Sequence, residues 1–316
     1  MKRIFELTSS DIMNMKGREL VETIRESEGR TVMAETIVTF PTPIYGVSNP
    51  ELAAAFGADL ITLNFFDFQK PFIFGIDDMD ANISKGPEEL IKLAEKASKN
   101  SQDADYIRNL KEIVGRFIGV NIEPVPEGIE YVEGRKLSRE NLEKIKFYRF
   151  DYVMITGNPN TGVNADTIIS GIEMSRKILG DDIMIIAGKM HGAGSGNIYD
   201  PQILKNFVEV GADCILIPAP GTVPGIDLNV AKMQIDAIHE AGALALTAIG
   251  TSQEGSQRSV IENIAVQSKM AGSDIQHIGD AGYAAGIATP ENIMALSIAI
   301  RGVRHTYRRM AYSIKK

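Results

Sequence analysis

The sequence predicts a single (β/α)8 barrel, and three observations support that prediction. Short apolar runs rich in β-branched residues alternate along the chain with amphipathic segments of helical periodicity. Near-identical joints, Gly57-Ala-Asp59, Gly211-Ala-Asp213 and Gly272-Ser-Asp274, stand between a helical segment and the strand that follows it. No strand is followed by the G-x-G-x-x-G turn that opens a helix in dinucleotide-binding folds, which disfavours an open doubly wound sheet.

The repeated joint explains how the units connect. Its glycine is suited to the left-handed conformation that ends a helix, and its aspartate (serine precedes it in the third copy) favours the turn into the strand. Short joints of this kind, with strand and helix alternating, indicate parallel strands joined by crossover helices. Eight such units close into a TIM barrel whose active-site end is the one at which the strands finish.

The elements follow in order from the amino terminus. A helix over residues 11–28, capped by Ser9 or Ser10 and ended by Gly29, is expected to cover the lower end of the barrel. The strands are expected at residues 31–40, 60–66, 117–123, 152–157, 182–188, 213–218, 244–250 and 275–279. The helices are expected at residues 49–56, 87–98 with 102–115, 138–148, 164–179, 200–210, 229–241, 256–271 and 289–312.

Two stretches interrupt this regular spacing within the single domain predicted for residues 1–316. Residues 67–116 are far longer than a simple connection, and Phe68–Asp80 within them is aromatic, acidic and loop-like. Two interpretations stay open for this insertion: a surface elaboration that packs on a neighbouring element, or a lid over the barrel mouth. Residues 124–136 are expected to form a short extended excursion.

Composition restricts the class of protein. The chain has 316 residues, 44% hydrophobic and 23% charged, and a net charge of -8, which argues against nucleic-acid and anionic-membrane partners. The single cysteine, Cys214, lies in an apolar run and is expected to be a buried thiol. No apolar run reaches membrane-spanning length and no signal sequence is evident, so we expect a cytoplasmic protein.

Polar residues at the ends of the predicted strands indicate a site. Both faces of a barrel strand are buried, so polar side chains at the carboxyl ends are expected to face the mouth. Lys189 and His191 follow the fifth strand, and a lysine among apolar residues must find an anion or lose its proton. We expect Lys189 to stabilise an enolate or form an imine, with His191 or Glu35 moving the proton and Asn121 and Glu123 completing the catalytic group. The alternatives are a buried ion pair for Lys189 and a backbone-bound loop histidine for His191.

A second candidate site lies in the glycine-rich loops after strands seven and eight. Glycines let backbone N–H groups approach an anion, and these two loops are a frequent phosphate site in barrels. The residues expected to hold a substrate phosphate are Gly250, Thr251, Gly279, Asp280 and Gly282. The alternative is that these glycines serve only as turn residues.

Metal binding is a further option without a motif of its own. Glu35, Asp67, Glu123 and Asp280 could hold Mg²⁺ together with water, and no cofactor is otherwise indicated. A zinc site from His191 and His277 is less favoured. His277 itself is expected to pack inside the last strand.

The eight units and the endings Ile249-Gly-Thr and Ile278-Gly-Asp-Ala-Gly resemble the phosphate-binding TIM-barrel enzymes of the ribulose-phosphate-binding type. The whole chain also resembles bacterial barrel proteins labelled phosphoenolpyruvate phosphomutase-like. The Asp-x-Asp-x-Gly-x-Gly and Lys-x-Cys-Gly-His segments of the mutase and isocitrate-lyase barrels are absent, and Gly188-Lys-Met-His-Gly192 lacks the cysteine. The resemblance therefore implies the fold and transfers no catalytic residue.

Together these features predict an enzyme acting on a small phosphorylated metabolite, such as a sugar phosphate, as an aldolase-type lyase or an isomerase. The first alternative is a Mg²⁺-dependent lyase or mutase that cleaves C–C or P–C bonds. The second is a barrel that binds a phosphorylated metabolite without turnover. A homo-oligomer is also expected, with the last helix and its arginines (Arg301, Arg304, Arg308 and Arg309) as the subunit contact; the alternative for these residues is a basic helix end.

Overall fold

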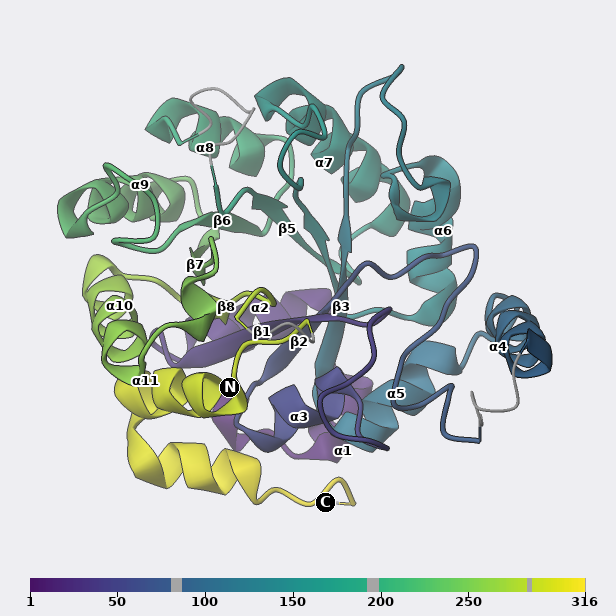
Figure 1. Ribbon diagram of the computed structural model, residues 1–316. Coiled ribbons are helices and arrows are strands. Elements are labelled where there is room, and N and C mark those ends of the chain that lie inside the picture. The colour runs from purple at the N-terminus through teal and green to yellow at the C-terminus, as the bar shows by residue number, and fades with distance from the viewer. Residues whose placement is uncertain (81–86, 192–198, 283–285, 316) are drawn as a thin grey trace.

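The computed structural model is a closed parallel barrel in the order β1 to β8, surrounded by helices (Figure 1). It describes residues 1–80, 87–191, 199–282 and 286–315. The strands are β1 (Thr31–Ile37), β2 (Leu60–Asn64), β3 (Phe117–Ile122), β4 (Tyr152–Ile155), β5 (Met184–Gly188), β6 (Cys214–Pro218), β7 (Leu244–Ile249) and β8 (Ile275–Ile278). The predicted (β/α)8 barrel is confirmed, and each strand lies within or close to its expected range.

Helices connect the strands and cover the outside of the barrel. The α-helices are α1 (Ser9–Asn14), α2 (Gly17–Arg25), α3 (Asn49–Ala55), α4 (Pro87–Asn100), α5 (Tyr106–Val114), α6 (Arg139–Tyr148), α7 (Ala165–Leu179), α8 (Pro201–Glu209), α9 (Leu228–Glu240), α10 (Arg258–Ala271) and α11 (Pro290–Met310). Short 3-10 helices are η1 (Ile4–Glu6), η3 (Glu133–Arg135) and η4 (Gln253–Gly255).

The amino-terminal helix predicted over residues 11–28 is wrong in one respect, because the segment forms two short helices. The backbone is extended at Met15 and Lys16, and Thr8 rather than a serine caps α1. Gly17 begins α2 with its N–H bonded to the carbonyl of Asp182 at 2.8 Å, and a Cβ on Gly17 would lie 2.8 Å from the carbonyl oxygen of Asp181. The chain breaks here so that it can dock on the loop before β5.

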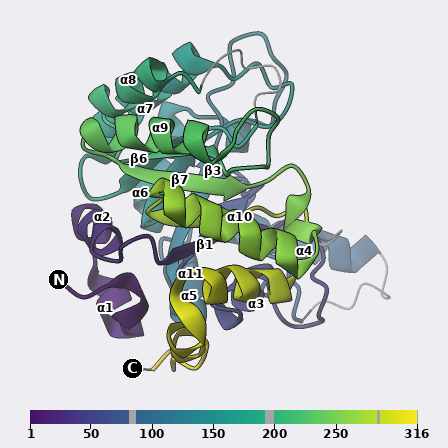
Figure 2. The ribbon, with the colours of Figure 1, turned by 90° about the vertical axis from the view of Figure 1, so that its left-hand side faces the viewer.

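The predicted position of this segment is nevertheless correct. Apolar side chains of η1, α1 and α2 join the inward side chains of the strands, including Met33, Phe117 and Tyr152, in one buried cluster. Figure 2 shows α1 and α2 together at the end of the barrel where both chain ends lie. This lower end is closed by apolar packing, which leaves the opposite end, the mouth, for polar groups.

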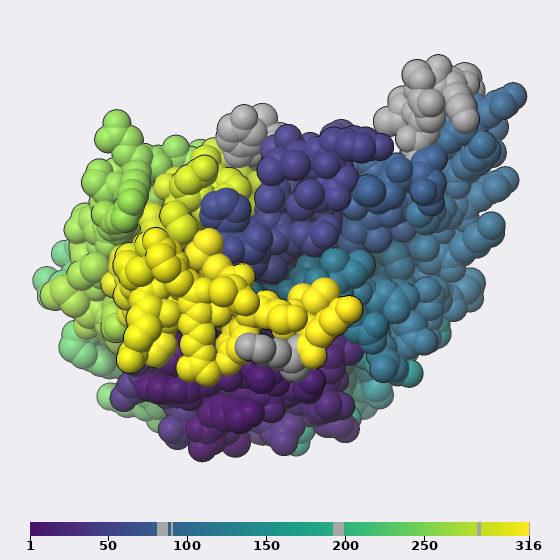
Figure 3. Space-filling view, turned by 90° about the horizontal axis from the view of Figure 1, so that it is seen from below, coloured from purple at the N-terminus to yellow at the C-terminus, as the bar shows by residue number. Residues whose placement is uncertain are grey.

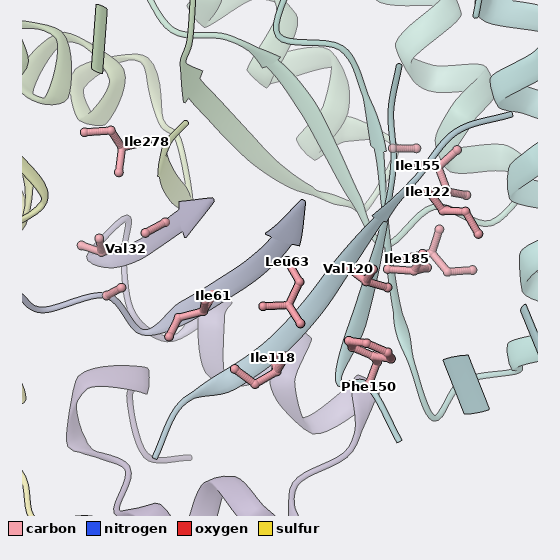
Figure 4. Close-up of a cluster of buried hydrophobic side chains, with 14 of the residues drawn as sticks. Val32, Ile61, Leu63, Ile118, Val120, Ile122, Phe150, Ile155, Ile185 and Ile278 are labelled. Atoms are coloured by element: carbon pink, nitrogen blue, oxygen red, sulfur yellow. The ribbon is translucent and has the colours of Figure 1, made fainter. Parts of the chain in front are cut away.

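A second apolar layer lies between the strands and the helices. Figure 4 shows part of it as side chains such as Val32, Ile61, Val120 and Ile185, which come from β1, β2, β3 and β5 and are fully buried. These residues alternate with the inward ones, as strand geometry requires. Cys214 is buried, as expected for an inert core thiol.

The aspartate that precedes every second strand has a role beyond the turn. The carboxylates of Asp59, Asp151, Asp213 and Asp274 each accept the N–H of a residue in the preceding strand, at 2.8–2.9 Å. Each also has a cationic or imidazole partner on the helices: Arg301 and Arg309, Lys111, Arg176 and His239, respectively. The repeated joint therefore ties neighbouring strands to the helical shell.

The carboxyl-terminal helix differs from its prediction in two ways. Gly302 has non-helical angles, with φ at 76°, so α11 is kinked there. Arg301 and Arg309 are buried against Asp59, whereas Arg304 and Arg308 are exposed. Figure 3 shows the yellow carboxyl-terminal helix beside the purple amino-terminal segment. Arg309 donates a hydrogen bond to the backbone carbonyl of Leu7 in that segment, at 3.1 Å. Arg301 and Arg309 are thus internal residues rather than subunit contacts, and the homo-oligomer stays a prediction.

The insertion is only partly a loop. Asp77 organises it, since its carboxylate accepts the hydroxyl of Tyr106 at 2.5 Å and the N–H of Ile73 at 2.8 Å. Phe66 and Phe68 pack with Tyr148, which anchors the beginning of the insertion under the helices. Figure 1 places α4 at the periphery of the molecule. Residues 81–86 of the proposed lid lie outside the described residues, and the lid stays a prediction.

Candidate functional site

Three strands bring polar side chains together in the upper interior of the barrel. Glu35 on β1 accepts a hydrogen bond from the side-chain amide of Asn121 on β3 at 2.6 Å. Its other oxygen lies 3.2 Å from Nε2 of His277 on β8. Glu35 is 3% exposed and His277 is 0% exposed, so this group is held away from solvent. The sequence-predicted pair Glu35 and Asn121 does meet, and His277 joins it instead of merely packing.

A hydroxyl pair lies lower in the interior. The hydroxyls of Tyr152 and Thr62 are 2.9 Å apart, and both side chains are buried. Gly119 makes room for the tyrosine, because a Cβ there would lie 2.1 Å from the ring. Burial, followed by smaller effects that include the charge of Glu35, raises the pKa of Tyr152 well above its usual range. Tyr152 is therefore a neutral hydrogen-bonding group beneath the site.

Asp280, which follows β8, adds a second carboxyl group. Its Oδ2 accepts a hydrogen bond from Asn64, at the end of β2, at 2.8 Å. Burial and then the nearby charge of Glu35 raise the pKa of Asp280 to about 8. A carboxyl group with such a pKa holds a proton at neutral pH and can act as a general acid. We refer to the carboxyl groups of Glu35, Asp280 and Glu254, together with the imidazole of His277, as the acid cluster.

A second group forms around Lys189 and His191, after β5. Lys189 is 1% exposed, and burial lowers the pKa of its amine, with the carboxylate of Glu123 opposing the shift. Burial and the charge of Lys189 lower the pKa of His191, so this imidazole is neutral near pH 7. The structure thus gathers three of the predicted catalytic residues, Lys189, His191 and Glu123, on one side of the mouth.

Glu123 is held by hydrogen bonds on both oxygens. Its Oε1 accepts the hydroxyl of Tyr131 at 2.5 Å and the side-chain amide of Asn158, and its Oε2 accepts the backbone N–H of Asn158 at 2.9 Å. These contacts fix the orientation of the carboxylate. Asn121 and Glu123 are two residues apart on β3 and at its end, so they connect the acid cluster to the lysine group.

The loops after β7 and β8 enclose the side chain of Glu254. The Glu254 side chain is 1% exposed, and its carboxylate accepts backbone hydrogen bonds from Ala281 and from its own N–H. A Cβ on Gly279 would lie 2.4 Å from Oε1 of Glu254, and one on Gly282 would lie 2.6 Å from its carbonyl carbon. Burial raises the pKa of Glu254. Its carboxylate therefore lies beside Gly279 and its backbone beside Gly282, in the place where a substrate phosphate was expected.

The other residues of the predicted phosphate site also have partners within the protein. Gly250 faces the sulfur of Met190, which would lie 2.7 Å from a Cβ at this position. The Thr251 hydroxyl donates to the carbonyl of Thr222 at 3.0 Å. Thr251 and Ser252 both have positive φ, 60° and 69°, which is unusual for residues with side chains and marks a strained turn before Glu254.

The four carboxylates named for Mg²⁺ do not converge. Asp67 lies in the insertion and accepts the N–H groups of Gln69 and Lys70, at 2.8 and 3.2 Å. Glu123 is committed to Tyr131 and Asn158, and Glu35 to Asn121 and His277. Within the described ranges, no three His, Cys, Asp or Glu side chains are placed to share a metal ion. These residues do not fit a magnesium site, and we derive no step through one.

Sequence reasoning did not assign a role to Glu254; it expected His277 to pack and considered it otherwise only for a less favoured zinc site. His277 is two residues after the inward Ile275, so strand alternation alone could have placed it inside the barrel. Glu254 is an acidic residue within the glycine-rich stretch Gly250–Gly255, but nothing in that stretch reveals that its carboxylate folds inward. Residues 192–198, which contain the glycines after His191, lie outside the described residues.

Comparison with solved structures finds barrel proteins of low sequence identity. The chain is similar to a thiamine phosphate pyrophosphorylase from Pyrococcus furiosus at 11% identity, with 86% of this chain and 96% of that chain covered and a TM-score of 0.48. It is similar to 2,3-dimethylmalate lyase, a member of the PEP mutase/isocitrate lyase superfamily, at 14% identity, 86% and 82% coverage and a TM-score of 0.46.

A Rhizobium etli pyruvate carboxylase has 11% identity and a TM-score of 0.50, with 96% of this chain covered but 30% of the carboxylase. At this identity the likeness to the carboxylase shows the fold alone.

Two further comparisons bear on the family. No curated protein matches the sequence. No helix in the described part of the chain combines the length and apolar character needed to cross a membrane. A family model described as "Domain of unknown function (DUF7916)" matches residues 5–316, and the chain therefore belongs to the DUF7916 family.

Proposed function

We propose that this chain is a lyase or isomerase that moves a proton next to the carbonyl group of a small anionic metabolite. The observation that carries the proposal is the buried amine of Lys189, 1% exposed and with a lowered pKa, at the same barrel mouth as the acid cluster. An amine that is neutral more often than an ordinary lysine can attack a carbonyl carbon. A carboxyl group that retains its proton can return one to carbon or oxygen.

The residues divide the chemistry between the two sides of the mouth. Lys189 would either stabilise an enolate oxygen as a cation or form an imine with loss of water, which increases the acidity of the neighbouring carbon. His191, neutral at pH 7, and Glu123 lie on the lysine side and would exchange protons with the substrate oxygen. Glu35, backed by His277, would take the proton from carbon, and Asp280 would supply one.

We infer the substrate class, a small anionic carbonyl compound, from the amine of Lys189 rather than from the glycine-rich loops after β7 and β8. A phosphorylated metabolite such as a sugar phosphate stays within the proposal, together with carboxylated acids such as 2-oxo acids. Because Glu254 fills the cradle formed by Gly279 and Gly282, the anionic end of the substrate would bind elsewhere at the mouth unless Glu254 moved. Two anions at one place would repel each other strongly in a desolvated site.

Two readouts test this function with a panel of ketose phosphates and 2-oxo acids. Borohydride is added to each incubation, and the mass of the peptide that contains Lys189 is measured. Exchange of the substrate's carbon-bound hydrogen with deuterium oxide is followed in parallel. Trapping at Lys189 indicates an imine, and exchange without trapping indicates an enolate.

Lys189→Met is expected to abolish both signals. Lys232→Met, at a 57% exposed side chain on α9, is the matched control and should retain both. Exchange that persists in Lys189→Met would exclude the proposed role of the amine. Tight binding of a panel member without exchange or product would instead favour a barrel that binds metabolites without turnover, and activity that is lost with EDTA would favour the Mg²⁺-dependent alternative.

A further inference from the structure

Arg135 is an arginine at the mouth whose position the proposed mechanism does not use. It ends η3, in the connection after β3, and its backbone carbonyl accepts the N–H of Glu123 at 3.2 Å. Its guanidinium carbon lies 4.6 Å from the centre of the Phe65 ring, in stacking range. Phe65 in turn contacts the ring of Phe40 edge-on, with 6.3 Å between centroids. Arg135, Phe65 and Phe40 form a platform over the ends of β1, β2 and β3.

The platform is built at some energetic cost. Phe65 has a φ of 59°, a left-handed conformation that a bulky side chain rarely adopts. Its N–H donates to Oδ1 of Asn64 at 2.9 Å, which holds the turn. The other end of the Asn64 amide donates to Asp280 at 2.8 Å. One asparagine therefore links the platform directly to the acid cluster.

The guanidinium of Arg135 has no acceptor among the residues that the structure describes. Its Nε is buried and lacks a hydrogen-bond partner. The carboxylates near it are engaged elsewhere: Glu123 with Tyr131 and Asn158, and Asp67 with the N–H groups of Gln69 and Lys70. Glu133 pairs with Lys136 at 2.5 Å. A buried donor without an acceptor destabilises the folded protein, and a bound anion would remove that cost.

Arg135 can bind an anion while it contacts Phe65. A guanidinium is planar and carries N–H donors along its edge, where they can bind two oxygens of one oxyanion. From these observations, which rest on the proposed function for the choice of ligand, we infer that Arg135 binds the carboxylate or phosphate end of the substrate. The anion would then sit on the β2–β3 side of the mouth, away from the loops that Glu254 fills.

The test compares wild type with Arg135→Gln and Arg135→Lys, using Arg139→Gln as the matched control because Arg139 is exposed at the start of α6. Dissociation constants are measured by calorimetry for pyruvate, dihydroxyacetone phosphate and inorganic phosphate, with neutral dihydroxyacetone as the uncharged probe. Pyruvate and the phosphate probes separate a carboxylate preference from a phosphate preference.

Arg135→Gln is expected to weaken binding of the preferred anion by about 10- to 100-fold, as for loss of a charge-assisted hydrogen bond. Arg135→Lys should recover only part of this loss, since lysine keeps the charge but not the planar pair of donors. Binding of dihydroxyacetone and the properties of Arg139→Gln should stay at wild-type values. Urea unfolding of both Arg135 variants shows whether the fold is kept. If Arg135→Gln is less stable than wild type, the anion affinity of Arg135→Lys alone is used to test the inference.

The inference is overturned if the Arg135 variants bind the anions as wild type does, or if wild type binds none of them. Its failure is distinguishable from failure of the proposed function. If Lys189 is trapped or the substrate exchanges its hydrogen, but anions bind independently of Arg135, only the proposed anion site is excluded. Arg135-dependent binding without trapping or exchange would keep the anion site and remove the reaction.

Discussion

Nε2 of His277 lies 3.2 Å from Oε2 of Glu35 inside the barrel, with the histidine fully buried and the glutamate 3% exposed. The other glutamate oxygen accepts the amide of Asn121, so the carboxylate is held from both sides. In the function that we propose Glu35 is the base, and these contacts would fix its orientation before a substrate arrives.

Glu35→Gln tests this assignment. Glutamine has nearly the same shape and can still accept the hydrogen bond from Asn121, while the basic carboxylate beside His277 is lost. We expect the rate of deuterium exchange into a panel substrate to fall by about 10²- to 10⁴-fold. The urea midpoint should stay close to wild type. Glu240→Gln, on the exposed end of α9, serves as the control, and wild-type exchange in Glu35→Gln would show that another group is the base.

Asp280 predicts a dependence of stability on pH. Burial raises the pKa of its carboxyl from 3.8 to about 8, so the folded state binds more protons than the unfolded state between these values. The contribution of Asp280 to the free energy of unfolding therefore falls as pH rises through that interval and becomes constant above it. Asp280→Asn removes this contribution, and its stability relative to wild type should increase from about pH 4 to about pH 8.

Urea unfolding of both proteins at about pH 5, 7 and 9 measures this difference. Asp181→Asn is the control, because the Asp181 side chain is 65% exposed and should show no such trend. A constant difference between Asp280→Asn and wild type across the range would contradict the raised pKa.

Asp59 predicts the largest loss of stability. Its two oxygens lie 2.5 Å from Arg301 and 2.9 Å from Arg309, and all three side chains are buried. Asp59→Asn would leave two guanidinium groups in the interior without a counter-charge, at a cost of about 3–5 kcal/mol. Asp236→Asn, which removes a surface ion pair with Lys232, should change the free energy of unfolding by less than about 1 kcal/mol. Equal effects of the two substitutions in urea unfolding would show that the buried cluster is not needed for stability.

The barrel itself could be predicted because its signals are local. Each strand is a short apolar run, and the Gly-Ala-Asp joint marks where three of the helices end. The ion pairs that these aspartates form could not be predicted, since Arg301 is 242 residues from Asp59 in the sequence and Arg176 is 37 from Asp213. The break between α1 and α2 was missed for the same reason, because Gly17 is selected by its contact with the loop before β5.

The candidate site divides in the same way. Glu35, Asn121 and Glu123 could be placed at the mouth because strand alternation fixes the direction of each side chain. Glu254 could not, because a strained turn at Thr251 and Ser252 decides where its carboxylate goes. Arg135 was missed because it follows an irregular connection, and its importance lies in the absence of an acceptor within the described part of the chain.

Glu254→Ala decides whether the glycine loops retain the ability to bind phosphate. In wild type the Glu254 carboxylate takes the backbone N–H of Ala281 and packs against Gly279, which satisfies the positive region that a phosphate would use. Removing the carboxylate leaves that region open while Asn292 still holds the loop through the carbonyls of Glu254 and Ser256, at 2.8 and 2.9 Å. We therefore expect inorganic phosphate to raise the Tm of Glu254→Ala more than that of wild type.

Two further variants make this result specific. Glu254→Ala combined with Gly279→Ala should lose the added response to phosphate, because the new methyl group would enter the space that the carboxylate left. Glu262→Ala, on the outer part of α10, should respond as wild type does. An equal response in wild type and Glu254→Ala that disappears with Gly279→Ala would mean that phosphate displaces the carboxylate, so the loops, rather than Arg135, would hold the anionic end of the substrate.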